Sequence, residues 1–174
     1  MSESNVAIIY YTRTGNTETI AQMIRDGLMA REVVADMIKI EVEGVVNFRR
    51  IGKMANEDVP LLNTEFDLSD YDLTIIGTPI WGGRTPMPLI SYLRNAADGW
   101  DGRATLFLTG MRKVRKNEAI VEQIEREIGE YGFGGIEAWM ILKFRRGKLV
   151  EGDDSIPDFI DRIEGIYREL SISE

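Results

Sequence analysis

The feature of this sequence that most limits its fold is a regular alternation of short apolar runs with amphipathic stretches. The apolar runs are rich in β-branched and aromatic residues, and the stretches between them repeat apolar residues at helical spacing. The sequence predicts strands at 6–11, 33–42, 73–77, 104–109 and 136–142, and helices at 16–30, around 89–97, around 120–128 and from 155 onward. Strands that alternate with helices in this way are typical of an α/β fold built on a parallel sheet.

Details of these runs predict where each element lies. The run 6–11 is continuously apolar and 73–77 is wholly buried in character, which favours central strands. The run 33–42 carries three charged residues, so we expect it at an exposed edge. The first helix is expected to bury one face made of Ile20, Met23, Ile24, Gly27 and Leu28. Asn117 is predicted to cap the helix around 120–128. Pro157 is predicted to lie in the first turn of the last helix. That helix is expected to bury Phe159, Ile160, Ile163, Ile166, Tyr167 and Leu170.

The chain has 174 residues, the size of one ordinary domain, and 44% of them are hydrophobic. It shows no internal repeat and no linker, so we expect a single domain over 1–174. No apolar stretch has membrane-spanning length, and residues 1–5 lack the pattern of a secretory signal, so no membrane span and a cytoplasmic location are expected. An irregular segment from 43 to 70, with a helix predicted at 46–56, is long enough to be a functional loop or a packed insertion.

Composition excludes several kinds of chemistry. The chain has no cysteine and no histidine, which rules out disulfides, thiolate and imidazole metal sites, and Ser-His-Asp or cysteine nucleophiles. We assign no catalytic residue and no metal ligand, and any redox chemistry must come from a bound organic cofactor. The net charge of −8 disfavours nucleic acid and anionic membranes as partners. It fits either plain solubility or attraction to basic partners.

A cluster of hydrogen-bond donors stands between the first strand and its helix. It consists of Thr12, Arg13, Thr14, Gly15, Asn16 and Thr17. Backbone N–H groups at a helix N-terminus attract a phosphate dianion, and the hydroxyls and the amide add further donors. An ordinary turn with a capping residue would use similar residues. Six suitable residues in succession at a strand-to-helix turn favour a phosphate site, although the spacing is neither that of a P-loop nor GxGxxG.

A second unusual segment, 77–88, directly follows the third predicted strand. It contains Trp81 beside Gly82 and Gly83, together with three prolines. The indole offers a flat surface on which an aromatic ring can stack, and the glycines let the backbone approach such a ring. The alternative is a tryptophan that packs in the core within a turn.

Both segments resemble the flavodoxin family. Residues 11–18 are similar to the family's (Ser/Thr)-x-Thr-Gly-Asn-Thr loop, which wraps the phosphate of FMN, and 79–83 resemble a Pro-Ile-Trp-Trp-Gly loop beside the flavin ring, with Gly82 in place of the second tryptophan. The resemblance implies a doubly wound, five-stranded parallel sheet in the order 2-1-3-4-5 with helices on both faces. It also implies that Thr78, Pro79, Ile80, Trp81, Gly82 and Gly83 join the first loop in binding FMN at the switch point between strands 1 and 3.

In flavodoxins the loop after the fourth strand covers the second face of the flavin, which implies contacts from Thr109, Gly110 and Met111 here. The sequence departs from that family, because this loop has no aromatic residue and continues into four cations within 112–116. Met111 could cover the ring instead. The cations would stabilise an anionic reduced flavin, attract an acidic partner or a phosphorylated cosubstrate, or simply be solvated. Arg145, Arg146 and Lys148 form a second basic group, and the sequence does not show whether the two groups meet.

Three functions follow from this resemblance. The first is an electron-transfer flavodoxin that exchanges electrons with redox partner proteins. The second is an NAD(P)H- or quinone-linked FMN oxidoreductase, in which Arg84 or Arg112 recognises a small-molecule electron donor or acceptor. The third is an interaction module of the same fold that has lost FMN.

Overall fold

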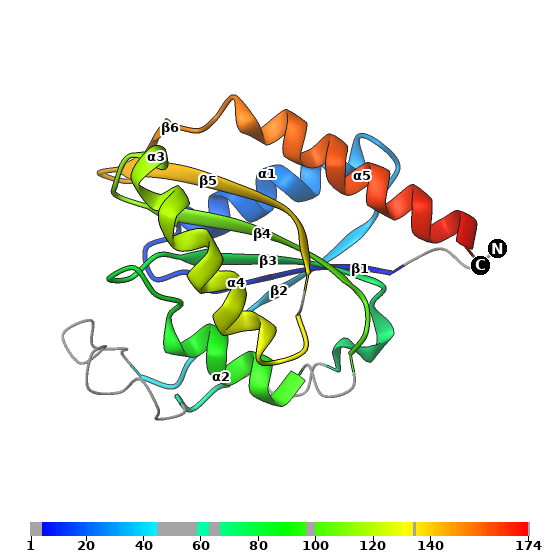
Figure 1. Cartoon of the computed structure of the whole chain (residues 1–174), viewed down its shortest axis with the longest axis horizontal. Coiled ribbons are helices and arrows are strands. Elements are labelled where there is room, and N and C mark those ends of the chain that lie inside the picture. The colour runs from blue at the N-terminus through cyan, green and yellow to red at the C-terminus, as the bar shows by residue number, and fades with distance from the viewer. Residues whose placement is uncertain (1–4, 45–58, 63–66, 97–99, 134, 174) are drawn as a thin grey trace.

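The computed structural model describes residues 5–44, 59–62, 67–96, 100–133 and 135–173, and its centre is a six-stranded sheet (Figure 1). The strands stand in the order β2-β1-β3-β4-β5-β6. They are β1 Val6–Tyr10, β2 Ala35–Lys39, β3 Leu73–Pro79, β4 Arg103–Gly110, β5 Ile136–Arg145 and β6 Lys148–Glu151. The first five are parallel in the predicted order, so the α/β fold class and the flavodoxin-like topology are confirmed. As expected, the charged strand β2 lies at an edge.

The sixth strand was not anticipated. Strand β5 extends to Arg145, three residues beyond its predicted end, and β6 turns back to pair with it antiparallel. A two-residue turn of Arg146 and Gly147 joins them, with φ of 51° and 75°; positive φ at both central residues is the pattern of a type I′ hairpin turn. The sequence analysis missed this hairpin because charged residues fill the positions that apolar residues usually mark.

Helices cover both faces of the sheet (Figure 1). They are α1 Asn16–Met29, α2 Met87–Ala96, α3 Val114–Asn117, α4 Val121–Gly129 and α5 Ser155–Ser173, with short 3-10 segments at Leu68–Asp70 and Glu118–Ile120. One hydrophobic cluster packs α1 and α5 against the sheet, and another packs α2 and α4 against the opposite face. Burial of both faces explains why β1 and β3 contain no charged residue.

Two predicted faces need correction. In α1, Met23 is 42% exposed rather than buried, and Ala21 takes its place in the core beside Ile20 and Ile24. The helical period of about 100° per residue turns position 23 to the margin of the buried stripe. In α5, Tyr167 and Leu170 are only partly buried, whereas the four isoleucine and phenylalanine positions predicted before them are buried.

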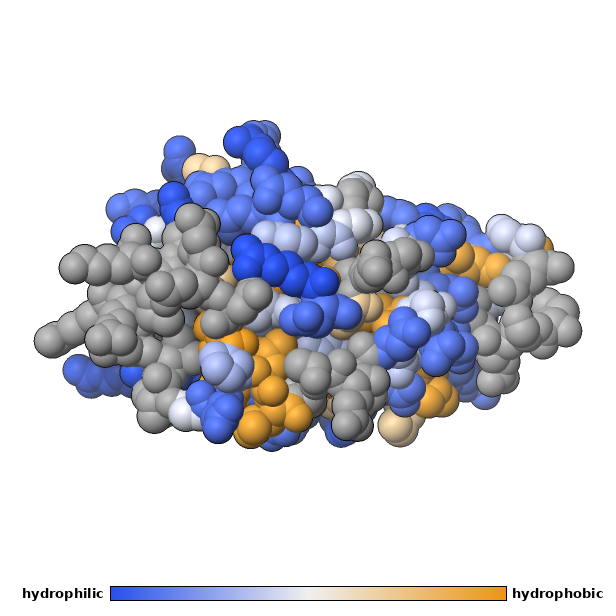
Figure 2. Space-filling model, turned by 90° about the horizontal axis from the view of Figure 1, so that it is seen from below, coloured by the Kyte–Doolittle hydropathy of each residue, from blue (hydrophilic) through white to orange (hydrophobic). Residues whose placement is uncertain are grey.

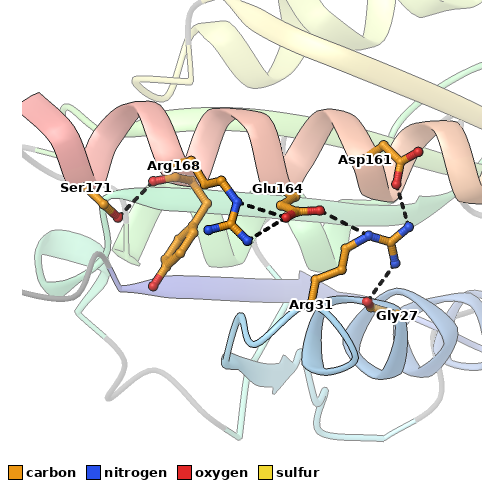
Figure 3. Close-up of polar contacts among 7 residues, drawn as sticks. Gly27, Arg31, Asp161, Glu164, Arg168 and Ser171 are labelled. Atoms are coloured by element: carbon orange, nitrogen blue, oxygen red, sulfur yellow. Dashed lines mark hydrogen bonds and ion pairs between the residues drawn. The ribbon is translucent and has the colours of Figure 1, made fainter.

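Helices α1 and α5 are joined by packing and by ion pairs. Gly27 of α1 lies so close to Ile160 that a Cβ atom there would stand 2.5 Å from its Cδ1. Arg31, which follows α1, donates to the Gly27 carbonyl and pairs with Asp161 and Glu164 of α5, as Figure 3 shows. Arg168 pairs with the same Glu164, so one carboxylate connects two cations across the helix pair.

Little of the irregular segment between β2 and β3 falls within the described residues. Val42 forms an antiparallel bridge with Leu61, and Asp67 caps the 3-10 turn Leu68–Asp70 through Ser69 N–H. The helix predicted at 46–56, and Ala97 of the helix predicted around 89–97, lie outside the described residues.

Figure 2 shows the molecule from the side of α2, where most of the coloured surface is hydrophilic and the apolar residues form one larger area and several smaller ones. A hydrophilic surface agrees with a charged fraction of 29%. Among the described helices, none combines the length and apolar character needed to cross a bilayer.

Candidate functional site

Three loops leave the carboxyl ends of β1, β3 and β4, which are neighbours in the sheet. Because parallel strands end at the same edge, these loops meet at the point where the strand order reverses, the usual binding place in such folds. They enclose a pocket of about 570 Å³. It is lined by Thr12, Arg13, Thr14, Asn16, Thr17, Pro79, Ile80, Trp81, Gly82, Gly83, Thr109, Gly110, Met111, Arg112, Asn117 and Ile120.

The first loop presents backbone donors to this pocket. Gly15 precedes α1 in the left-handed conformation, with φ of 88°, and its N–H donates to Thr12 Oγ1 at 3.0 Å. The first intrahelical bond runs from Thr19 N–H to the Gly15 carbonyl, so the N–H groups of residues 16–18 have no helical acceptor. No side chain caps the helix, which overturns the simple capping interpretation of this turn. The helix start is therefore available to an anion.

A buried hydrogen bond holds the first loop to the third. The hydroxyls of Thr17, at the start of α1, and Thr109, near the end of β4, are 2.8 Å apart. Their residues are only 1% and 3% exposed, although both line the pocket. Such a bond between two loops that are 92 residues apart in sequence fixes the floor of the pocket.

The second loop is a tight hairpin. Trp81 and Arg84 exchange two backbone hydrogen bonds, at 3.1 and 3.0 Å, and Gly82 and Gly83 form the turn with φ of 58° and 78°. Positive φ at both positions requires glycine or a similarly permissive residue, which explains the glycine pair. The turn places the peptide groups of both glycines at the pocket, free of hydrogen bonds to the described backbone.

Trp81 belongs both to the core and to the pocket. It is 7% exposed, and its ring meets Tyr11 edge-on, with centroids 5.6 Å apart and planes at 80°. Burial raises the pKa of the Tyr11 hydroxyl, so the ring that contacts Trp81 stays uncharged. Trp81 therefore packs in the core, as one interpretation of the sequence expected, and it also lines the pocket; stacking of a ring on the indole stays a prediction.

The third side of the pocket contains residues that the sequence analysis did not assign to it. Asn117 was predicted as a helix cap, but it makes no capping bond. It is buried at the end of α3, where its amide donates to the Arg112 carbonyl at 3.4 Å, and it lines the pocket together with Ile120. Nothing in the sequence separates this asparagine from a capping residue, because both stand before a helix.

The pocket lining is positive in an acidic chain. It includes Arg13 and Arg112 and no carboxylate among the described residues. The acidic residue of the first turn of α1, Glu18, accepts hydrogen bonds from Tyr10 and Lys39 instead. Burial and the bond to Glu18 raise the pKa of the Tyr10 hydroxyl, which remains a donor. The site therefore favours a ligand with negative charge.

The comparisons with known proteins agree with this arrangement. Residues 8–88 match the family model described as Flavodoxin, a range that includes the first two loops of the pocket. The chain has a flavodoxin-like fold. The matched range ends before β4, so the third loop lies beyond it.

Solved structures share the fold of this flavodoxin-like protein at low sequence identity. A flavoprotein in complex with FMN from Lactobacillus acidophilus has a TM-score of 0.61 and 18% identity, covering 90% of this chain and 98% of that one. A WrbA-like flavodoxin from Agrobacterium tumefaciens has a TM-score of 0.65 and 16% identity, covering 95% and 98%.

Curated relatives are enzymes with longer chains. An NAD(P)H dehydrogenase (quinone) from Acidovorax ebreus is 27% identical over 97 residues, which are 56% of this chain and 48% of the relative. A protein of the same name from Gluconacetobacter diazotrophicus is 26% identical over 107 residues. The flavodoxin-like chain thus spans about half the length of these relatives.

Of the fifteen residues expected at the cofactor site, thirteen line the pocket. The other two are Gly15, which shapes the first loop, and Thr78, which is fully buried and donates to the Pro79 carbonyl. Arg112 lines the pocket and Arg84 is not among the lining residues, so only the former is placed to recognise a ligand in it. Contact of these residues with a cofactor stays a prediction.

Proposed function

We propose that this chain binds FMN, with the phosphate on the loop from Thr12 to Thr17. The observation that carries the proposal is the pocket itself, which combines helix N-terminal amides, hydroxyls and two arginines with no carboxylate among its described lining residues. A dianionic phosphate needs such converging donors. The volume of about 570 Å³ lies in the range of cofactor pockets.

The flavin ring would lie against the Trp81 loop. The lining there is apolar or backbone and includes Pro79, Ile80, Trp81 and Met111. The peptide groups of Gly82 and Gly83 supply a hydrogen-bond donor and an acceptor that can respond when the ring changes its protonation. Bound FMN would supply one- and two-electron redox chemistry, and the chain would bind, orient and partly shield it.

The function that this supports best is electron transfer by a flavodoxin-like carrier in the cytoplasm. No group in the pocket is suited to act as a general acid or base, because its described lining has no carboxylate and the chain has no histidine. A carrier needs only a bound flavin that is accessible to a partner.

A second candidate is an NAD(P)H- or quinone-linked oxidoreductase, and two observations favour it. The curated relatives are named NAD(P)H dehydrogenase (quinone). Met111, the residue placed to cover the ring, is 84% exposed, which leaves room for a small substrate beside the flavin. Arg112 would then bind its phosphate.

FMN binding is tested by the visible spectrum and the fluorescence of the purified chain before and after addition of FMN. We expect binding with quenched flavin fluorescence. Replacing Thr14 and Asn16 by leucine should abolish it, whereas the control Gln22→Leu, on the exposed side of α1, should not affect it. A wild-type chain that stays colourless would support the interaction module, and unchanged binding in the double variant would mean that the phosphate lies elsewhere.

The carrier and the reductase differ in their response to reduced nicotinamides. The FMN-loaded chain is mixed with NADH or NADPH without oxygen. Bleaching of the flavin within seconds would support the reductase. If the flavin stays oxidised but accumulates a one-electron-reduced form on chemical titration, the carrier is supported.

A further inference from the structure

Seven exposed cations occur in two short segments of this acidic chain. Four of the five residues in 112–116 are basic, and so are three of the four in 145–148. We call these side chains the basic rim: Arg112, Lys113, Arg115, Lys116, Arg145, Arg146 and Lys148. The net charge of the chain is −8, so the charge outside the basic rim is −15. The rim therefore has the opposite sign to the rest of the molecule.

The fold brings the two segments together. Gly110, at the end of β4, pairs with Lys143 of β5, and β5 continues two residues further before its hairpin turn. The chain that leaves Gly110 passes beside this hairpin, where Val114 N–H donates to Glu151 of β6 at 3.1 Å. Helix α3 packs on β5, as Figure 1 shows. The cations of both segments thus share one corner of the carboxyl edge of the sheet.

The charge of the basic rim is not neutralised inside the chain. All seven residues are exposed, and in the described part of the chain none of their side chains forms an ion pair or a hydrogen bond. Glu151, the acidic residue at the junction, is paired with Lys143 at 3.7 Å and accepts the Val114 N–H. Acidic residues follow each basic segment in the sequence: Glu118 after the first, and Asp153 and Asp154 after the second.

The basic rim adjoins the opening of the pocket. Arg112 lines the pocket, and Met111, next to it, is 84% exposed. A molecule attracted to the rim would come to rest beside the edge of a flavin in the pocket.

We propose that the basic rim is the docking surface for an acidic, one-electron carrier protein. The proposal rests on the proposed binding of FMN, because the docked carrier exchanges its electron with the flavin. One electron leaves the metal centre of the carrier, which is oxidised by one unit, and the flavin ring gains it. Complementary charge of this kind raises the association rate and orients the partner, and it weakens with salt.

The extent of the rim favours a protein over other anions. A single phosphate group needs converging donors in a recess, whereas these seven side chains are spread over a loop, a short helix and a hairpin. A nucleic acid extends beyond such a corner and would meet the −15 charge of the remaining surface. An acidic patch on a compact protein is opposite in charge to the rim and comparable to it in size.

Binding is tested by calorimetry with a plant-type [2Fe–2S] ferredoxin as the acidic carrier and cytochrome c as the basic one, using the full chain with and without FMN. We expect ferredoxin to bind at about 10 mM salt and to weaken at least about tenfold at about 150 mM, because the screening length falls from about 30 to about 8 Å. Cytochrome c should show no preference for the rim.

Two sets of variants locate the surface. The triple variant Lys113→Glu, Arg115→Glu and Lys116→Glu should weaken ferredoxin binding at least about tenfold. The control Arg25→Glu, Arg162→Glu and Arg168→Glu changes the net charge equally on α1 and α5, and should change binding less than about threefold. If the first variant does not fold, Arg145→Gln with Lys148→Gln repeats the test on the hairpin.

Several results would overturn the proposal. One is equal loss of binding in both triple variants, which would indicate net charge alone. A second is a triple rim variant that binds ferredoxin as the wild type does but uses NADPH less well than NADH, which would assign the rim to a phosphorylated cosubstrate. A third is tighter binding of an oligonucleotide than of ferredoxin by the wild-type chain. The FMN titration is made separately, so a chain that binds ferredoxin but no FMN would refute the proposed function and the electron exchange, and would leave only the docking surface.

Discussion

The hydrogen bond between Thr17 and Thr109 allows a quantitative test of how the pocket is held together. Replacing either residue by valine keeps the shape of the side chain but leaves the other hydroxyl buried without its partner. An unsatisfied buried hydroxyl costs about 1–3 kcal/mol, so each single variant should lose about that much free energy of unfolding. For a chain of this size, each kcal/mol lowers Tm by about 2–4 °C.

The double variant should behave differently. Thr17→Val with Thr109→Val replaces two hydroxyls by two methyl groups in contact, which is nearly neutral when both partners are changed together. The coupling energy, which is the loss in the double variant minus the two single losses, should therefore have a magnitude of about 2–6 kcal/mol. Thr105→Val is the control, because the hydroxyl of Thr105 is buried with no partner in the described part of the chain and its removal should not destabilise the protein.

The assay is urea denaturation of the chain without FMN, followed by circular dichroism, with the slope of the transition compared among the variants. Additive losses in the double variant would refute the reasoning, since they would show that the two hydroxyls do not depend on each other. The same variants titrated with FMN should show weaker binding in the single variants, because the start of α1 is then less firmly held.

Three further predictions concern the fold around the site. Gly77→Ala should cost about 1–3 kcal/mol in urea denaturation, because its Cβ would stand 2.1 Å from Cζ of Phe107, and Phe107→Leu should recover part of the loss; an unaffected single variant would contradict this packing. Arg31→Ala should lower the free energy of unfolding by about 1 kcal/mol, and by less at high salt. Arg31→Lys should not restore the loss, because lysine lacks the planar guanidinium that joins α1 to α5. Full restoration by lysine would show that the guanidinium geometry is not needed. Burial and the hydrogen bond to Asp36 raise the pKa of Tyr71 to about 12. The protonated hydroxyl therefore stabilises the fold fully below about pH 10, and this contribution disappears as the pH rises towards 12. In the variant Tyr71→Phe, the free energy of unfolding should fall less steeply over that pH range.

Much of the fold could be predicted from the sequence because its signals are local. Apolar runs without charges marked β1 and β3, and apolar residues at helical spacing marked the helices between the strands. The hairpin of β5 and β6 could not be found this way, because its strands end in charged residues and its pairing depends on contacts between chain segments. That all 174 residues form one domain stays a prediction.

The candidate site was predictable where backbone conformation demands particular residues. Gly15, Gly82 and Gly83 have positive φ and so reveal their loops in the sequence. Asn117 and Ile120 reach the pocket only because α3 and the turn after it fold back over β4, and no local pattern encodes that approach.

The turn at Arg146 carries a cost in conformational free energy. With φ of 51°, this arginine holds a left-handed conformation that disfavours most side chains by about 1–2 kcal/mol, whereas asparagine before glycine suits such a turn. Arg146→Asn should therefore raise the melting temperature while it removes one positive charge from the corner beside the pocket. If the basic rim binds a partner as proposed, the more stable variant should bind that partner less well, so thermal stability and partner binding would oppose each other at this position.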